Sequence, residues 1–291
     1  MKLLKSLFLN LTVFGLMVSS PSAIAAPKPD LWERWTAHDA NSSAAIDHSA
    51  WNDLLTRYLE PGSDGINRFA YARLQNADAD RQNLRNYLDT MSTIEISNYN
   101  RDQQRAYWIN LYNAITIDVV VSSYPVESIR DIRGGFFSAG PWGLKLIKVE
   151  NEELTLDDIE HRILRPIWKD PRVHYAVNCA SIGCPNLQAQ AFTADNTESL
   201  LQQGAVAFVN HPRGARVTAG KLHVSSIYDW FDVDFGGTDA GVISHLREYA
   251  NADLKAALDR VDKIHNDSYD WSINAAVEPG ANRSSGRRSG S

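Results

Sequence analysis

Residues 101–122 constrain the fold more than any other part of the sequence, because they predict a helix that is apolar on all sides. A helix of this kind is buried at the centre of a domain. Asn110 and Asn113 lie on one face of it, and buried amides need hydrogen-bond partners. We therefore expect both amides to have hydrogen-bond partners. The apolar residues around the helix are Trp108, Ile109, Leu111, Tyr112, Ile115, Ile117 and Val119–Val121.

Shorter helices and strands flank this central helix. Thr155 and Asp158 resemble a capping box at the start of a short helix over 156–165, which ends at Pro166. Helices and short strands occur without a repeated strand–helix–strand order, which indicates the α+β class. The other predicted helices begin at Asp47 or cover 80–91, 195–210 and 240–261. The predicted strands cover 144–149, 153–155, 173–179, 269–273 and two segments around Gly220.

The two ends of the chain differ from its body. In residues 1–25, Lys2 and Lys5 precede a short apolar run that ends in a small-x-small site, as in a secretory signal. The run is too short for a stable membrane span, so an uncleaved anchor is the less favoured interpretation. We expect an exported protein, periplasmic or secreted, without an integral membrane span. The remainder divides into an N-terminal helical segment (26–94), a main domain (95–275) and a disordered tail (276–291).

The body of the chain is acidic. The formal charge of the whole sequence is −6; Lys2 and Lys5 precede residue 26, and the tail 277–291 holds three Arg and one Glu, so residues 26–276 carry a charge of −10. Proteins that bind nucleic acids need clustered Lys and Arg side chains on their surface. We therefore expect no nucleic-acid partner.

The segment 173–185 carries both cysteines of the chain, Cys179 and Cys184, together with His174. A catalytic thiol needs an imidazole that accepts its proton and a third group that orients the ring. On an extended strand, His174 and Cys179 point to opposite sides because they are five residues apart. The pair therefore works only if the chain turns at Asn178 and Cys179.

Two structural interpretations compete with thiol chemistry. In an exported protein, Cys179 and Cys184 can close a small disulfide loop, and their spacing does not decide between a disulfide and a free thiol. A zinc site is less favoured, because one Cys-x4-Cys pair with a nearby His lacks a second pair of ligands.

Glu160 falls inside the apolar stripe of the predicted helix 156–165. A carboxylate that faces the core is costly unless it is paired, so Glu160 is expected to contact an Arg, an Asn or an imidazole. This contact is either a structural ion pair or the orienting group of a catalytic site. His161 projects off the stripe, and periodicity alone predicts a solvated histidine beside Arg165.

Asp229, Asp232 and Asp234 form an acidic turn with carboxylates of the type that binds calcium. Their spacing lacks the glycine and the closing glutamate of an EF-hand loop. A solvated turn is therefore the favoured interpretation, with calcium as the alternative. The sequence contains no P-loop, dinucleotide fingerprint, zincin motif or Gly-x-Ser-x-Gly elbow.

Five ordered motifs resemble the DUF547 family, a domain of unknown function. The resemblance covers residues 95–275, most of the chain after the signal-like segment. The motifs are YWINLYNA (107–114), LDDIEHRILR (156–165), VHYAVNCASIGCP (173–185), YDWF (228–231) and YDWSIN (269–274).

The resemblance implies a fold similar to papain-like and transglutaminase-like cysteine peptidases, in which a central buried helix packs on a small, mainly antiparallel sheet with additional helices. It also implies a calcium-activated protease that uses a Cys, a His and a Glu. On this chain they would be Cys179, His174 (or His161) and Glu160. One departure is that papain-like enzymes place the nucleophile at the start of the central helix, which here has no Cys.

Two functions follow as hypotheses. In the first, an exported peptidase or amidase uses Cys179 as nucleophile, His174 as base and Glu160 as orienting acid, while backbone N–H groups or the Asn110 and Asn113 amides bind the oxyanion. In the second, a non-enzymatic module binds a peptide or protein through the aromatic loop 136–142 and the acidic turn 229–234, and Cys179–Cys184 is a structural disulfide. Substrate and oligomeric state are left open by the sequence.

Overall fold

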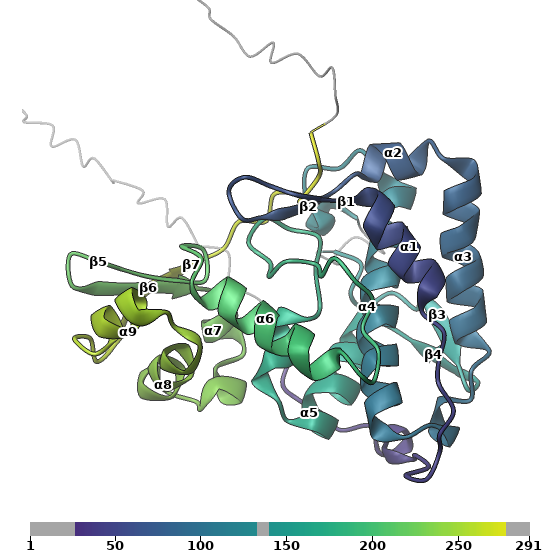
Figure 1. Cartoon of the computed structure of the whole chain (residues 1–291), viewed down its shortest axis with the longest axis horizontal. Helices are drawn as coiled ribbons and strands as arrows, with labels where there is room; N and C mark the ends of the chain where they lie inside the picture. The colour runs from purple at the N-terminus through teal and green to yellow at the C-terminus, as the bar shows by residue number, and fades with distance from the viewer. Residues whose placement is uncertain (1–26, 133–139, 278–291) are drawn as a thin grey trace, which may run out of the picture.

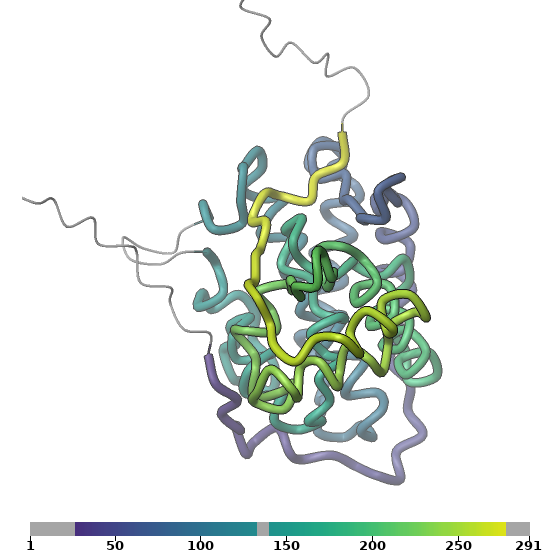
Figure 2. Tube along the Cα trace, turned by 90° about the vertical axis from the view of Figure 1, so that its left-hand side faces the viewer, coloured from purple at the N-terminus to yellow at the C-terminus, as the bar shows by residue number. Residues whose placement is uncertain are grey.

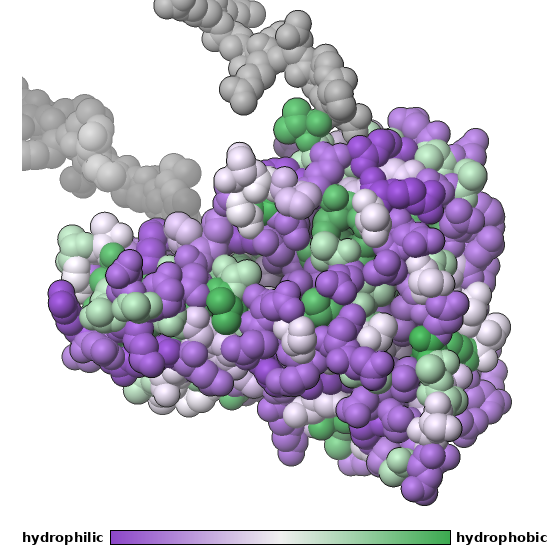
Figure 3. All heavy atoms as spheres, viewed as in Figure 1, coloured by the Kyte–Doolittle hydropathy of each residue, from purple (hydrophilic) through white to green (hydrophobic). Residues whose placement is uncertain are grey.

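The structure, a computed structural model, describes residues 27–132 and 140–277. The signal-like segment 1–25, Phe136, Phe137 and nearly all of the predicted tail lie outside the described residues. In the part that is described, no helix is long and apolar enough to cross a membrane. The face drawn in Figure 3 is largely hydrophilic, with small and separate hydrophobic patches.

The described chain mixes helices with short strands, which confirms the α+β class. The first half contains α1 (Ser49–Tyr58), β1 (Leu59–Pro61), β2 (Asn67–Phe69), α2 (Tyr71–Gln75), α3 (Asp78–Ser92), α4 (Arg101–Ser123), β3 (Ile147–Val149) and β4 (Glu152–Leu154). The second half contains η4 (Asp158–Leu164), α5 (Arg165–Trp168), η5 (Pro171–Tyr175), α6 (Thr197–Val209), β5 (Ala215–Thr218), β6 (Lys221–Ser225), α7 (Ile227–Trp230), η6 (Asp232–Phe235), α8 (Asp239–Tyr249), α9 (Ala252–Leu258) and β7 (Ile264–Ser268).

Helix α4 is the central helix that the sequence predicted (Figure 1). Asn100 caps it by accepting a hydrogen bond from the backbone N–H of Gln103 (3.0 Å). Trp108 and Asn110 lie on nearly opposite sides of the helix, and both are at most 1% exposed. Its main neighbours are α2, α3, η4 and α6. The burial on all sides is therefore confirmed, with helices rather than a single sheet as the main packing partners.

Two hydrophobic cores form, and the predicted site lies where they meet. The larger core surrounds α4 and includes side chains of α1, α2, α3 and η4. The smaller core joins α6, α8 and the sheet of β5 and β6, on the left in Figure 1. Val173 and Ala176 belong to the larger core, whereas Tyr175 belongs to the smaller one.

The strands of the described residues form three small sheets. β1–β2 and β3–β4 are antiparallel pairs, and β6 pairs antiparallel with β5 and parallel with β7. After β7 the chain follows an extended path along one face of the molecule (Figure 2). On this path Ile273 pairs with Ser181, and Ala275 pairs with Phe69. The C-terminal segment thus connects the loop that holds the cysteines to the first hairpin.

Three predicted elements are wrong in type or extent. Residues 173–179 do not form a strand, because Asp170 accepts a hydrogen bond from the N–H of Arg172 and Pro171 begins the 3-10 helix η5. The last strand is β7, and residues 269–273 make only an isolated bridge. The helical stretch 240–261 is divided where Asn251 caps α9.

The helix predicted over 156–165 forms, but with a different geometry. Its capping box is confirmed, because the N–H of Asp158 donates to Thr155 Oγ1 (2.9 Å) and the N–H of Thr155 donates to Asp158 Oδ2 (3.0 Å). Segment η4 then has π-helical turns and continues beyond Pro166 as α5. Wider turns rotate successive residues by a smaller angle than an α-helix does. His161, predicted to be solvated, is therefore turned inward and is only 5% exposed.

Candidate active site

The loop that holds both cysteines is fixed to the central helix by Asn113. The Asn113 amide donates from Nδ2 to the carbonyl of Ala176 (2.9 Å) and accepts at Oδ1 from the N–H of Asn178 (2.8 Å). Asn110 binds another segment in the same way, because its amide both donates to and accepts from the backbone of Phe192 (2.7 and 2.9 Å). Both amides thus have backbone partners, as expected, and these contacts leave the oxyanion role to other groups.

The chain turns sharply at Cys179, as the thiol hypothesis required. Asn178 donates to the carbonyl of Pro185 (2.7 Å) and accepts from the N–H of Ala180 (2.9 Å). Ala180 has a φ of 58°, in the left-handed region that residues with a side chain rarely adopt. Such strain persists where the surroundings enforce it and is concentrated at functional sites. The turn leaves Cys179 partly accessible, while Ala180 beside it is fully buried.

Cys179 is surrounded by hydrogen-bonding groups. Its Sγ lies 3.0 Å from the hydroxyl of Tyr269 and 3.3 Å from that of Ser181. Its N–H donates to Sγ of Cys184 (3.1 Å). The hydrogen bond with the Cys184 side chain, together with those from Ser181 and Tyr269, outweighs burial and lowers the pKa of the Cys179 thiol. Cys179 is therefore the cysteine that ionises first.

Both cysteines are free thiols in the structure. Cys184 is buried, and burial raises the pKa of its thiol well above the usual range, an effect that its contact with Cys179 reinforces. Because the pKa values of the two adjacent thiols are shifted in opposite directions, Cys179 can act as a nucleophile while Cys184 stays a neutral donor beside it. The arrangement matches the thiol interpretation, and the disulfide stays an alternative for oxidising conditions.

His174 is held between two carboxylates and not beside Cys179. Its Nε2 donates to Oδ2 of Asp234 (2.7 Å), and its Nδ1 lies 3.5 Å from Oε1 of Glu160. Its ring stacks on Phe231 at 4.3 Å. Burial opposes a charge on the ring, but the hydrogen bonds to Asp234 and Glu160 outweigh it and raise the pKa of His174. His174 is thus a buried imidazolium with both ring nitrogens engaged by acids.

Glu160 faces the core and pairs with an imidazole, as its position in the sequence predicted. Burial opposes ionisation of Glu160, but the imidazoles of His161 and His174 and the guanidinium of Arg165 outweigh it and lower its pKa to about 2. Arg165 completes the network by donating from Nε to Oδ2 of Asp234 (2.6 Å). Glu160 and His174 are therefore brought together, but as part of a buried ion network.

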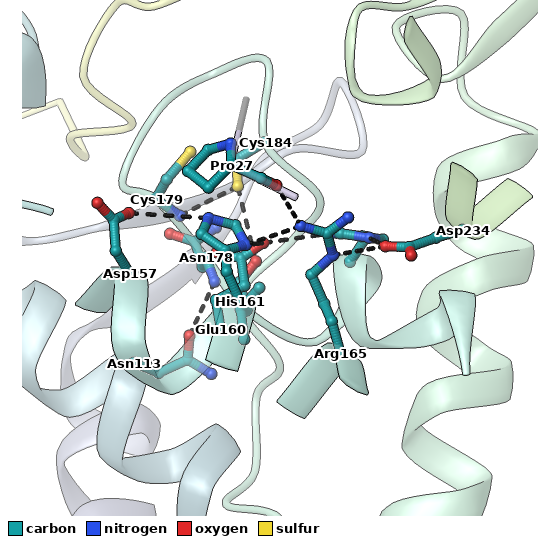
Figure 4. A network of polar contacts seen from close by, with 12 residues as sticks. Pro27, Asn113, Asp157, Glu160, His161, Arg165, Asn178, Cys179, Cys184 and Asp234 are labelled. Atoms are coloured by element: carbon teal, nitrogen blue, oxygen red, sulfur yellow. Dashed lines mark hydrogen bonds and ion pairs between the residues drawn. The ribbon is translucent and has the colours of Figure 1, made fainter. Parts of the chain in front are cut away.

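His161 lies on the Cys179 side of this network (Figure 4). Nη1 of Arg165 is 3.0 Å from His161 Nδ1. Since arginine has no acceptor, Nδ1 accepts this hydrogen bond and a neutral His161 carries its proton on Nε2. Burial, reinforced by Arg165 and partly opposed by Glu160, lowers the pKa of His161 to about 4. His161 is therefore neutral at pH 7.

Asp157 is a site residue that sequence reasoning missed. Its Oδ1 lies 3.7 Å from Nε2 of His161, opposite the Arg165 contact (Figure 4). Burial and the nearby Glu160 and Asp158 carboxylates raise the pKa of Asp157 to about 6. Its side chain is 41% exposed, so the carboxyl is open to proton exchange with solvent. The signal available in the sequence was the i, i+4 spacing of Asp157 and His161.

The acidic turn is divided between two environments. Asp234 contacts Arg165 and His174, whereas Asp229 and Asp232 are exposed. Burial and the neighbouring Asp267 and Asp232 carboxylates raise the pKa of Asp229. Within the described ranges, no three His, Cys, Asp or Glu side chains are grouped as metal ligands. The one acidic side chain of this turn that joins the site does so as an ion-pair partner.

Aromatic side chains of two predicted motifs meet next to the thiol. The rings of Trp230 and Tyr269 are 4.8 Å apart, and those of Tyr269 and Trp271 are 4.6 Å apart. Trp142 packs edge-on against Trp271 at 5.8 Å. In the sequence Tyr269 is only one residue of the motif 269–274, yet its hydroxyl contacts the Cys179 sulfur. The cluster therefore borders the candidate nucleophile.

Comparison with known proteins identifies a family. Residues 96–209 match the family model described as a protein of unknown function, DUF547. This range contains Glu160, His161, His174, Cys179 and Cys184, whereas Tyr269 and the acidic turn lie beyond it. No curated protein and no solved structure matches the chain.

Proposed function

We propose that this chain, a DUF547 protein over residues 96–209, is a thiol-dependent hydrolase of peptide or amide bonds with Cys179 as its nucleophile. The observation that supports this most is the environment of Cys179, a partly exposed residue at a strained turn whose sulfur is contacted by two hydroxyl groups. A thiol with a lowered pKa and an accessible sulfur is what nucleophilic catalysis by cysteine requires. The signal-like residues 1–25 support export, so the proposed substrate lies outside the cytoplasm.

In the proposed reaction the nucleophile is the thiolate form of Cys179, which the hydrogen bonds from Ser181 and Tyr269 favour. The Cys179 sulfur attacks the carbonyl carbon, the C–S bond forms, and the carbonyl electron pair moves to oxygen. Collapse of this intermediate breaks the C–N bond and leaves a thioester on Cys179, which water then hydrolyses. The leaving amine takes up one proton, and the attacking water gives one up.

The His161–Asp157 pair supports this proton exchange better than the predicted pair of His174 and Glu160. His174 donates from Nε2 to Asp234 and is engaged by Glu160 at its other nitrogen. The Asp157 carboxyl, with its pKa raised to about 6, is half-exposed and close to Nε2 of His161. In the proposal, protonated Asp157 donates a proton to the leaving amine. The Asp157 carboxylate then accepts a proton from the attacking water, and His161 orients this carboxyl group.

The proposed function predicts an acyl-enzyme. Purified protein is incubated with p-nitrophenyl acetate, and the acetylated protein and the released nitrophenol are followed by intact mass and absorbance. Cys179→Ala is expected to abolish both acetylation and turnover, whereas Cys184→Ala, which removes the neighbouring thiol but leaves the nucleophile, is expected to slow acetylation without abolishing it. His161→Gln is expected to acetylate but to hydrolyse the thioester slowly. Equal turnover in wild-type and Cys179→Ala protein contradicts the proposal.

A non-enzymatic binding module is the second candidate. It is favoured by the half-buried aromatic cluster of Trp142, Trp230, Tyr269 and Trp271, and by the engagement of His174 with two acids. In this alternative the cluster contacts a peptide or protein partner, and a Cys179–Cys184 disulfide staples the loop under oxidising conditions. The alternative predicts no acyl-enzyme turnover and a melting temperature that falls when a reductant is added.

A further inference from the structure

We infer that Tyr269 is a catalytic residue, whose hydroxyl binds the Cys179 sulfur before the reaction and the substrate carbonyl oxygen during it. The role of Tyr269 during the reaction rests on the proposed function. Its contact with the sulfur before the reaction concerns only the two side chains and is tested without a substrate.

The geometry places three side-chain atoms in mutual contact. The Tyr269 hydroxyl is 3.0 Å from Cys179 Sγ and 2.8 Å from Ser181 Oγ, and Ser181 Oγ is 3.3 Å from the same sulfur. The phenol has one hydrogen to donate. When it points at the sulfur, the Ser181 hydroxyl donates either to the phenol oxygen or to the sulfur. In both cases the sulfur receives a hydroxyl hydrogen bond, which favours its anionic form.

Tyr269 stays protonated while Cys179 is ionised. Burial raises the pKa of Tyr269 well above its usual range, and the charge of the Cys179 thiolate raises it further. The pKa of Cys179 is shifted in the opposite direction. Within this pair the proton therefore belongs to the phenol, which is a donor throughout the physiological range of pH.

The phenol is held in place by the backbone on one side and by aromatic rings on the other. The N–H of Gly183 donates to the carbonyl of Asp270 (2.8 Å), next to Tyr269 in the chain. A Cβ atom at Gly183 would lie 2.8 Å from the nitrogen of Asp270 and 2.9 Å from its oxygen, so glycine is required for this approach. Trp230 and Trp271 pack against the Tyr269 ring. A donor fixed in this way loses little entropy in the reaction.

Four backbone donors around the thiol are already used, which favours the Tyr269 hydroxyl as the oxyanion donor. The N–H of Cys179 donates to Cys184 Sγ, and that of Ala180 donates to Asn178 Oδ1. The N–H groups of Ile182 and Gly183 bond to the C-terminal segment. When the sulfur forms its bond to carbon, negative charge leaves the sulfur and accumulates on the carbonyl oxygen. The Tyr269 hydrogen bond then shifts from the sulfur to that oxygen, without a change in protonation.

The test is the pH dependence of Cys179 alkylation by iodoacetamide in Tyr269→Phe protein, read by intact mass and peptide mapping. The loss of one hydrogen bond to the thiolate is expected to raise its apparent pKa by about one unit or more. Ser181→Ala, which removes the other hydroxyl at the sulfur, is expected to give a rise of its own. Tyr228→Phe, which removes a buried hydroxyl bonded to Tyr175 and not to the thiol, is the control and is expected to give none. An unchanged apparent pKa in Tyr269→Phe overturns the inference.

A second readout separates this inference from the proposed function. If p-nitrophenyl acetate is turned over, Tyr269→Phe is expected to lower kcat by about 100-fold with little change in KM. A complete lack of turnover in wild-type protein removes the proposed function, yet the alkylation profile still decides whether Tyr269 binds the thiolate. If Tyr269→Phe does not fold, 3,5-difluorotyrosine at position 269 keeps the ring and strengthens the donor. It is expected to lower the apparent thiol pKa, and an unchanged value again overturns the inference.

Discussion

The imidazole of His174 donates from Nε2 to Oδ2 of Asp234 at 2.7 Å, and the same oxygen accepts from Nε of Arg165 at 2.6 Å. Phe231 covers both cations, with Arg165 4.8 Å from its ring and the His174 ring stacked on it. Asp234 thus contacts two buried cations, which belong to segments η5 and α5, and balances them together with Glu160. This role explains why Asp234 faces inward from a turn whose other acids are exposed.

We expect Asp234→Asn to lower the free energy of unfolding by about 3 kcal/mol, because it leaves buried cations without their main counter-charge. Asp232→Asn changes an exposed acid of the same turn and is expected to cost less than about 0.5 kcal/mol. Urea denaturation of both variants measures the difference. Equal and small effects would show that the ion network does not stabilise the fold.

Three buried histidines make the fold sensitive to acid. Burial lowers the pKa values of His48, His161 and His245 to about 4. The pKa of each histidine is depressed from an unfolded value near 6.5. The contribution of its neutral form to the free energy of unfolding is therefore fully present above pH 6.5 and is lost as the pH falls toward 4. The contribution of each is about 3 kcal/mol at most. We therefore expect the urea midpoint to fall between pH 6.5 and 4.

The variant His245→Gln is expected to flatten this pH dependence, since it removes one of the three titrating groups. His38→Gln changes an exposed histidine and is the control. If the two variants have the same slope of midpoint against pH as the wild type, His245 is not the buried neutral group described.

A comparison of variants at Asn113 and Asn110 separates effects on the stability of the fold from effects on the reactivity of the Cys179 thiol. Both amides bond to backbone, but only Asn113 holds the loop that leads to Cys179. We expect Asn113→Ala and Asn110→Ala to lower the free energy of unfolding by similar amounts, about 2 kcal/mol. Only Asn113→Ala is expected to change the rate of Cys179 alkylation. A similar change in Asn110→Ala would mean that the loop is not positioned by Asn113.

Gly183 should tolerate no side chain. In Gly183→Ala the new methyl group meets the backbone of Asp270, and the C-terminal segment must move. We expect a loss of about 2 kcal/mol in the free energy of unfolding and a slower alkylation of Cys179, because Tyr269 moves with the segment. Gly143→Ala, where a Cβ meets nothing within 4 Å, is the control. Alkylation of Cys179 at the normal rate in a destabilised Gly183→Ala protein would argue against the C-terminal segment holding Tyr269 in position beside Cys179.

Local patterns were sufficient for part of the fold. The apolar circumference of residues 101–122 predicted a buried helix, and the polar Asn113 within it predicted a hydrogen-bond partner for its amide. The inward position of Glu160 was predicted in the same way, by a charge within an apolar stripe. Each of these predictions depends on residues within a few turns of one helix, where periodicity is informative.

The remainder depends on contacts or geometries that periodicity does not encode. Alternating residues at 173–179 resembled a strand, but the Asp170–Pro171 start produced a 3-10 turn that directs His174 toward Asp234. The π-helical turns of η4 moved His161 from the surface to the interior. Tyr269 lies 90 residues after Cys179, and only the folded C-terminal segment brings their side chains together.

The central claim is that Cys179 is a free, activated thiol, and alkylation of wild-type protein by iodoacetamide under non-reducing conditions between pH 5 and 9 tests it most directly. The account predicts fast addition of a single alkyl group, mapped to Cys179, with an apparent pKa below about 8.5, the ordinary value for a thiol. Cys184 is expected to react slowly, because it is buried and its pKa is raised. Absence of alkylation until a reductant is added, or an apparent pKa at or above about 8.5, would contradict the account.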